Sequence, residues 1–288
     1  MLKILQHFWS FVLYPTDRKL NPYRSDTYSK VFFTMFFFKV MILAVILPLQ
    51  YLVQYLDPIF TKKDDADENA LIYMISVVVL APLVEEFAFR FFLKYKKFFR
   101  YVISRNTWRK NYRWIAYSSV FLYGFAHLSN FENANLLFYI LGVLIVSSNL
   151  VDGFVYTFIR VRLGFIYSWG LYGFWNLFTF SLLGTIILLK NPVVKMDNPS
   201  MSLEVNVSQF RDTSELLFFV RESSDTLYNL NVRQYPLSQV IDSLYGKGTY
   251  QVYDEYVDID MRSAKGYKKD SLLIRLKKEF TIESIDKK

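Results

Sequence analysis

Two adjacent carboxylates and one guanidinium lie inside a run of residues, 82–93, that is otherwise apolar. Ionisable side chains at membrane depth are costly, so such a cluster is by default a hypothesis of function. On a helix, Glu86 and Arg90 lie four residues apart on one face, where they can pair. Glu85 lies about 100° away around that helix, so one arginine does not easily serve both carboxylates. Glu85 is therefore the candidate general base, and the alternative is a structural ion pair between packed helices.

The composition is that of a membrane protein. Hydrophobic residues make up 53% of the 288-residue chain and gather in long blocks, which soluble domains rarely show. The chain has no cysteine, which excludes disulfides and thiol chemistry. Its only histidines are His7 and His127, which excludes a metal site built on several imidazoles. We expect neither a metal nor a cofactor.

The net charge of +8 is unevenly distributed. Residues 1–194 carry 20 Lys and Arg against 11 Asp and Glu, whereas residues 195–288 carry 14 against 15. The excess belongs to the hydrophobic part, as expected for basic loops that face a cytoplasmic leaflet. The tail has no basic stripe, so the partner that the charge indicates is the lipid bilayer and not a nucleic acid.

The apolar blocks predict a multi-span α-helical membrane protein. Residues 1–16 place Ile4, Phe8, Phe11 and Val12 on one helical face, which predicts an interfacial helix lying on the bilayer. Five blocks are predicted to be spans; they are residues 31–56, 70–93, 114–129, 134–158 and 165–189. Lys39 lies in the first span, where we expect its ammonium group to reach toward the interface.

One loop indicates the orientation. Residues 94–113 carry eight basic side chains and no acidic one, and short loops with this bias stay in the cytoplasm. The N-terminus is then cytoplasmic, while the acidic loop of residues 57–69 and the tail after the fifth span lie outside. In this topology Glu85 is nearer the inner end of its span and His127 nearer the outer end of the next. The two meet only if one of these spans is shifted in depth.

From residue 191 the composition changes to that of a small α+β domain. Alternation of Leu203, Val205 and Val207 with polar residues predicts a half-buried strand. Further elements are predicted from similar patterns; they are strands over residues 215–221, 227–232, 249–258 and 271–276, and a helix over 236–245. The chain is thus divided into an N-terminal segment (1–30), a helical membrane core (31–190) and an extracytoplasmic α+β domain (191–288).

Polar residues on three different spans could meet inside a bundle. They are the cluster Glu85, Glu86 and Arg90, then His127, then Asn176. Taken singly, a histidine in an apolar span is more often a hydrogen-bonded core residue, and an asparagine is more often a contact between helices. Their occurrence together with a glutamate pair favours a site.

These residues resemble the motifs of the CAAX-protease and bacteriocin-processing (CPBP) family of intramembrane endopeptidases, which includes the Ras-converting endopeptidases. The family motif Glu-Glu-x-x-x-Arg is complete at residues 85–90. The motif Phe-x-x-x-His ends at His127, with Tyr123 in place of the phenylalanine. The motif His-x-x-x-Asn ends at Asn176, with Tyr172 in place of the histidine. The approach to this third motif also resembles the family, at Gly153, Tyr156, Arg160, Gly164 and Ser168.

The resemblance covers residues 70–180 and implies an endopeptidase that cuts a peptide or membrane-protein substrate within or beside the bilayer. Within the family, the glutamate at the position of Glu85 activates the attacking water and the histidine at the position of His127 assists it. Glu86 and Arg90 would support this base, and Asn176 would stabilise the oxyanion. Tyr172 can donate a hydrogen bond, but it cannot take up a proton near neutral pH as an imidazole does.

The tyrosine leaves two alternatives open. The chain is either a protease with an altered site, or a member without catalysis that acts as a scaffold and binds a protein partner through residues 191–288. A transporter is a third reading, against which the absence of an internal repeat argues. The many bacterial members of the family imply a bacterial cytoplasmic (inner) membrane. Residues 226–245 resemble the start of the periplasmic signalling domains of secretins and TonB-dependent receptors, the alternative being an unrelated α+β domain.

Overall fold

The computed structural model describes residues 1–288 except 20–24, 57–69, 134, 209–210, 254 and 286–288. The predicted acidic loop of residues 57–69 therefore lies outside the described part. The chain forms two compact units. The first comprises Met1–Pro58 and Met74–Phe178, and the second comprises Ile59–Tyr73 and Thr179–Lys288, with the boundary at Thr179 falling inside the last long helix.

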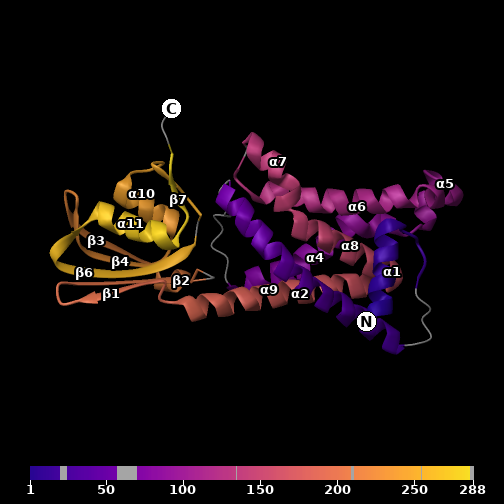
Figure 1. Ribbon diagram of the computed structural model, residues 1–288, viewed down its shortest axis with the longest axis horizontal. Coiled ribbons are helices and arrows are strands. Elements are labelled where there is room, and N and C mark those ends of the chain that lie inside the picture. The colour runs from indigo at the N-terminus through magenta and orange to yellow at the C-terminus, as the bar shows by residue number, and fades with distance from the viewer. Residues whose placement is uncertain (20–24, 57–69, 134, 209–210, 254, 286–288) are drawn as a thin grey trace. The chain divides into compact units, whose positions relative to one another are not determined.

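The first part of the chain is helical (Figure 1). Its α-helices are α1 (Leu2–Leu13), α2 (Ser25–Leu56), α3 (Ala70–Ile75), α4 (Ala81–Arg90), α5 (Arg105–Lys110), α6 (Tyr112–Ala126), α7 (Leu136–Ile145), α8 (Ser147–Arg162) and α9 (Phe165–Lys190). A π-helical segment joins α3 to α4 and is called η1 (Ser76–Leu80). Short 3₁₀ segments follow α4 and α6; they are η2 (Phe91–Leu93), η3 (Lys97–Tyr101) and η4 (His127–Asn130).

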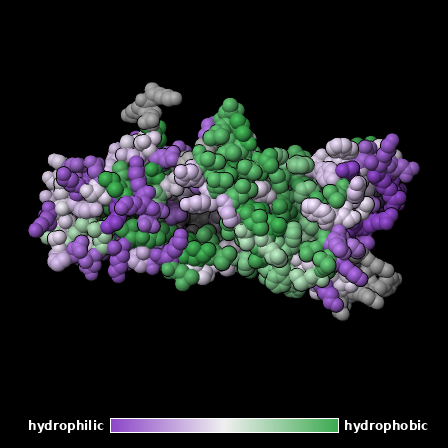
Figure 2. Space-filling model, in the orientation of Figure 1, coloured by the Kyte–Doolittle hydropathy of each residue, from purple (hydrophilic) through white to green (hydrophobic). Residues whose placement is uncertain are grey.

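Among the described residues, four helical stretches are long and apolar enough to cross a membrane, as in an integral membrane protein. They are Thr27–Leu56, Leu71–Leu93, Leu136–Arg162 and Phe165–Lys190. The fifth predicted span, residues 114–129, is helical as α6, but α6 has only 15 residues. At about 1.5 Å per residue it is about 22 Å long, less than a hydrocarbon core of about 30 Å. The surface over these helices is mainly apolar, and hydrophilic side chains gather over α5 (Figure 2).

Helix α1 forms as predicted, but the prediction that its apolar face lies on the bilayer is wrong. Phe8 and Phe11 are buried, and both rings contact Phe158 of α8 edge-on, with centroids 5.4 and 5.5 Å away. This face therefore packs against the bundle and not against lipid, because the aromatic surface of α8 covers it. Trp9 lies on the other side of α1 and is 62% exposed.

Helix α8 lies in the centre of the bundle, where every residue from 155 to 161 is buried. It packs closely against α6 because of Gly153, whose Cβ, if present, would lie 3.1 Å from Cγ1 of Val120 in α6. Small residues at such crossings let helix backbones approach each other in membranes. The approach brings the last turns of α8 next to α4, where the two glutamates lie.

The second unit is an α+β domain. Its main sheet is antiparallel, with the strand order β1 (Val194–Asn198), β2 (Met201–Ser208), β6 (Tyr256–Lys268), β4 (Thr226–Pro236) and β3 (Leu217–Ser223). Two short strands form a second sheet; they are β5 (Tyr250–Val252) and β7 (Ile282–Ser284). Helices α10 (Leu237–Tyr245) and α11 (Lys269–Glu279) cover one face of the main sheet (Figure 1), where the core of this unit lies.

The predicted strand at Leu203 and the predicted helix over 236–245 are confirmed as β2 and α10. The predicted strand over 249–258 is divided between β5 and the start of β6. The predicted strand over 271–276 is wrong, because these residues belong to α11. Leu272, Leu273 and Leu276 are buried there, a spacing that fits one face of a helix and not the alternation of a strand.

Candidate active site

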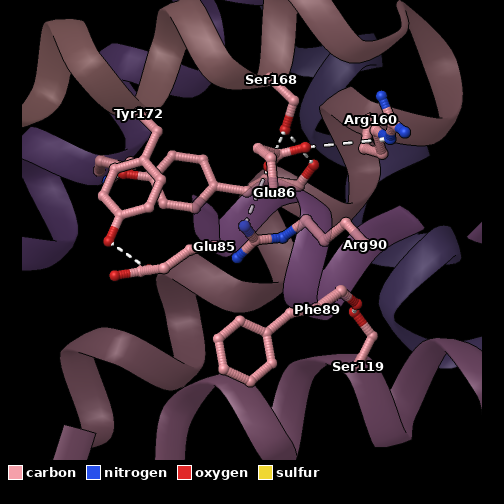
Figure 3. A network of polar contacts seen from close by, with 10 residues as sticks. Glu85, Glu86, Phe89, Arg90, Ser119, Arg160, Ser168 and Tyr172 are labelled. Carbon is pink, nitrogen blue, oxygen red and sulfur yellow. Dashed lines mark hydrogen bonds and ion pairs between the residues drawn. The ribbon is translucent and has the colours of Figure 1, made fainter. Parts of the chain in front are cut away.

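Glu86 is the centre of a buried polar cluster (Figure 3). Its Oε1 accepts a hydrogen bond from Nη1 of Arg90 at 2.9 Å, so the ion pair predicted from their spacing is present. Ser168 of α9 donates its hydroxyl to the same oxygen at 2.7 Å. Both partners of the ion pair are fully buried. Such a pair is stable only when further hydrogen bonds compensate its desolvation, and Ser168 provides one of them while tying α4 to α9.

Glu85 has a different environment from Glu86. Its side chain is half-buried, and its Oε2 accepts a hydrogen bond from the Tyr172 hydroxyl at 2.7 Å. Arg90 is bonded to Glu86 instead, so Glu85 has a neutral partner (Figure 3). The helical spacing predicted that Arg90 would pair with Glu86 and not with Glu85. Among the described residues, Glu85 is therefore left without a cation as its partner. A carboxylate so placed can accept a proton from a water molecule.

Tyr172 is held in place by a stack of aromatic rings. Its ring lies on Tyr156 of α8 with a centroid distance of 4.5 Å and an interplanar angle of 20°. The Tyr123 ring of α6 meets the Tyr172 ring edge-on at 6.2 Å. Offset and edge-on ring pairs of this kind are worth about 0.5–1.5 kcal/mol beyond the area they bury. The rings from α6, α8 and α9 thus fix the hydroxyl that faces Glu85.

Lys39 does not reach toward the interface, contrary to our expectation. It is 2% exposed, and its Nζ lies 2.9 Å from Oδ1 of Asp152 in α8. The ammonium also donates to the Tyr156 hydroxyl and lies 4.0 Å from the ring centroid of Trp175. The prediction is wrong because Asp152 lies at the same depth and neutralises the charge where it stands. This second buried ion pair supports Tyr156, on which Tyr172 stacks.

His127 lies at the end of α6, beside the cluster and not in contact with Glu85. Its Nδ1 is 2.8 Å from the Tyr123 carbonyl, so in this contact Nδ1 carries the proton and Nε2 keeps its lone pair. The Tyr123 ring lies between His127, at a centroid distance of 4.8 Å, and the guanidinium of Arg90, at 4.4 Å. Within the described part of the chain, no hydrogen bond joins His127 to Glu85.

The Asn176 side chain donates a hydrogen bond to a backbone carbonyl of the π-helical segment η1. The Ala81 N–H donates to the Ser76 carbonyl, five residues back. In the same pattern, the Val77 carbonyl would accept a hydrogen bond from the backbone N–H of residue 82. Residue 82 is a proline and has no N–H, so this bond cannot form. Nδ2 of Asn176 donates to this carbonyl instead, at 2.9 Å. One of the two amide protons that we expected at the oxyanion is therefore used to hold α9 against η1.

Of the six predicted site residues, the structure joins Glu86 with Arg90 and Glu85 with Tyr172, and it places His127 and Asn176 around them. Sequence reasoning gave no role to four further residues; these are Lys39, Asp152, Tyr156 and Ser168. Their polar groups inside apolar spans were the available signal. Among the described residues, no group of three or more His, Asp and Glu side chains is arranged to hold a metal ion.

The fold and site define an integral membrane protein with a buried glutamate pair in a helical bundle. Residues 67–178, which contain every predicted site residue, match the family described as Rce1-like, type II CAAX prenyl endopeptidase Rce1-like. This part of the chain is therefore an Rce1-like domain of the CPBP family, a family of peptide hydrolases. Comparison of the chain with curated proteins and with solved structures finds no match.

Proposed function

We propose that the chain is an intramembrane endopeptidase of the glutamate type. The observation that supports this proposal most directly is that the two glutamates have different partners. Arg90 neutralises Glu86, whereas Glu85 is half-buried and has a hydroxyl as its partner. A carboxylate that is held in place without a bonded cation can accept a proton from a water molecule.

In the proposed reaction a water molecule gives a proton to Glu85 as its oxygen attacks the carbonyl carbon of a peptide bond. The tetrahedral oxyanion then collapses, the C–N bond breaks, and the amine leaves with the proton from Glu85. Tyr172 orients the carboxylate through the hydrogen bond at 2.7 Å. His127 can accept a hydrogen bond at Nε2, which is the nitrogen that does not face the Tyr123 carbonyl.

A peptide is the substrate class that membership of this family implies. Glu85 lies in an apolar span and contacts Tyr172, whose ring packs against rings of α6 and α8, so a membrane-anchored peptide or the end of a membrane span suits the site better than a free soluble peptide. The α+β domain would then contribute a protein partner or part of the specificity, as we expected from its separate fold.

A second candidate is a family member without catalysis, which serves as a membrane scaffold. Two observations favour it. The amide of Asn176 is bonded to the Val77 carbonyl, and His127 does not contact Glu85. Fixed donors near a reacting carbonyl are commonly the largest contribution to catalysis, so their use elsewhere would leave a weak enzyme or none.

The test is Glu85→Gln in the full chain reconstituted into lipid vesicles, with turnover measured on membrane-anchored peptides. The protease proposal expects a loss of about 10²–10⁴-fold, the range of a missing general base. Glu132→Gln is the control, because Glu132 is an exposed carboxylate outside the cluster. Equal turnover in wild type and Glu85→Gln would contradict the proposal, and a well-folded wild type without turnover on any anchored peptide would favour the scaffold.

A further inference from the structure

Three cationic side chains converge where α4 and α8 end. Lys94 follows η2, is half-buried, and its Nζ would lie 4.0 Å from a Cβ placed on Gly164. The ammonium groups of Lys94 and Lys19 lie within hydrogen-bonding range of each other, and the charge of Arg160 acts on Lys94. Burial in the first place, and then the charges of Lys19, Arg160 and Lys96, lower the pKa of Lys94 to about 8. Like charges this close are unfavourable unless an anion lies between them.

Arg160 supplies an independent observation. It is 4% exposed, yet its Nε has no hydrogen-bond partner among the described residues. The nearest carboxylate oxygen is Oε2 of Glu86 at 3.9 Å, an ion-pair contact too long for a hydrogen bond, because Arg90 and Ser168 both donate to the other oxygen, Oε1. The terminal nitrogens of Arg160 point away from Glu86 (Figure 3). Nε therefore faces Glu86, and the terminal nitrogens are the donors that can meet a further acceptor.

Apart from Oε2 of Glu86, no described carboxylate forms an ion pair with this cluster. Neither Lys19 nor Lys94 forms an ion pair with a described carboxylate, and the neighbouring Lys96 lies over the Phe91 ring at 3.8 Å. The cluster therefore carries an excess of positive charge. A guanidinium fork and two ammonium groups together match the oxygens of a phosphate, which can accept from all of them.

The position of the cluster indicates where that phosphate comes from. Lys94 comes directly after the span Leu71–Leu93, and Arg160 lies in the last turn of the span Leu136–Arg162. Both side chains are therefore at the depth of lipid head groups. Rings suited to the glycerol and upper acyl region lie beside them, since Arg160 lies 4.8 Å from the Phe165 ring centroid. We propose that Lys19, Lys94 and Arg160 bind the phosphate of an anionic phospholipid.

The experiment measures lipid binding to the detergent-solubilised full chain by native mass spectrometry. Phosphatidylglycerol is titrated against phosphatidylcholine, and inorganic phosphate is added in a separate arm. Lys94→Gln and Lys19→Gln should each weaken phosphatidylglycerol binding about fivefold, the effect of one basic residue at an anionic surface. Lys94→Arg keeps the charge and should retain binding. Lys110→Gln is the matched control from the same basic loop, with an exposed side chain.

The lipid affinities of these variants either support or overturn the proposed phosphate site. A loss in Lys94→Gln that Lys110→Gln does not show, with Lys94→Arg binding normally, supports a built site. Equal losses in Lys94→Gln and Lys110→Gln would mean that the loop attracts anionic lipid only diffusely, and the proposal would be overturned. Displacement of the lipid by millimolar inorganic phosphate would show that the site takes free phosphate, which overturns the lipid as its occupant. Melting temperatures measured in parallel separate loss of binding from loss of fold.

Discussion

At the scale of single residues, the main question is what the Tyr172 hydroxyl does for Glu85. Tyr172→Phe keeps the ring that stacks on Tyr156 and removes only the hydroxyl that donates at 2.7 Å. If Tyr172 orients the base and donates to developing charge, we expect kcat/KM to fall about 10²-fold with little change in melting temperature. The measurement is turnover of an anchored peptide at several pH values.

The matched control for this prediction is Tyr139→Phe, because Tyr139 is 59% exposed and remote in sequence from the motifs. Tyr172→His adds a second arm, since it restores the imidazole of the family motif and introduces a group that titrates near neutral pH. Unchanged activity in Tyr172→Phe would mean that the hydroxyl does not contribute to catalysis. Higher activity in the phenylalanine variant would mean that it obstructs the base.

The sequence predicted the pairing of Glu86 with Arg90 because helical spacing alone decides it. It could not predict that Tyr172 would face Glu85 or that Ser168 would face Glu86, since those contacts join α4 to α9 and depend on how the helices cross. The error at Lys39 has the same origin. Whether a lysine reaches the interface or pairs in the core depends on a partner at the same depth, here Asp152, far away in sequence.

At the scale of elements, the contact between α9 and the π-helical segment should be sensitive to a single methyl group. A Cβ on Gly173 would lie 2.5 Å from the Val78 carbonyl oxygen, which belongs to the backbone and cannot simply rotate away. We expect Gly173→Ala to lower stability by about 1–3 kcal/mol, the cost of overpacking a tight contact. It should also lower activity, because the shift displaces Tyr172 relative to Glu85.

Gly170→Ala is the control within the same helix, since a Cβ there has nothing within 4 Å. It should be neutral or slightly stabilising, because alanine favours a helix over glycine by about 1 kcal/mol. Thermal unfolding of both variants in the same detergent is the measurement. Equal melting temperatures for the two variants would contradict the close contact between α9 and η1.

The long apolar helices and the alternating strand β2 could be predicted, because periodicity and length report on them directly. Pro82 lies within a predicted span, but the π-helical segment before it could not be predicted, because its unpaired carbonyl is satisfied by Asn176 of another helix. Helix α11 was mistaken for a strand because a short run of leucines fits either structure until its neighbours are known.

At the scale of the whole molecule, the contact between Lys94 and Gly164 bears on the number of membrane crossings. These residues follow α4 and α8, and they lie beside each other at one end of the first unit. The chain leaves Lys94, passes through α6 and returns through Leu136–Arg162. We therefore expect α6 to cross the membrane in the direction opposite to α8. Together with η4, its length comes to about 30 Å, enough for the hydrocarbon core.

Five crossings would place the two ends of the chain on opposite sides. Arg162 donates to the Thr16 carbonyl at 3.2 Å, so the segment after α1 lies on the side of Gly164. Helix α9 starts there and crosses once more before the α+β domain begins. The basic loop of residues 94–113 predicts that this side is cytoplasmic. The α+β domain is then expected outside, which an even number of crossings would not allow.

The chain has no cysteine, so single-cysteine variants report orientation without background. We expect Lys247→Cys, at an exposed position of the α+β domain, to react with a membrane-impermeant maleimide on intact bacterial cells. Lys110→Cys, exposed in the basic loop, should react only after the membrane is permeabilised. Labelling of both positions under the same condition would mean that α6 does not cross. In that case the α+β domain would meet its partner in the same compartment as the basic loop, and a periplasmic role for residues 191–288 would have to be given up.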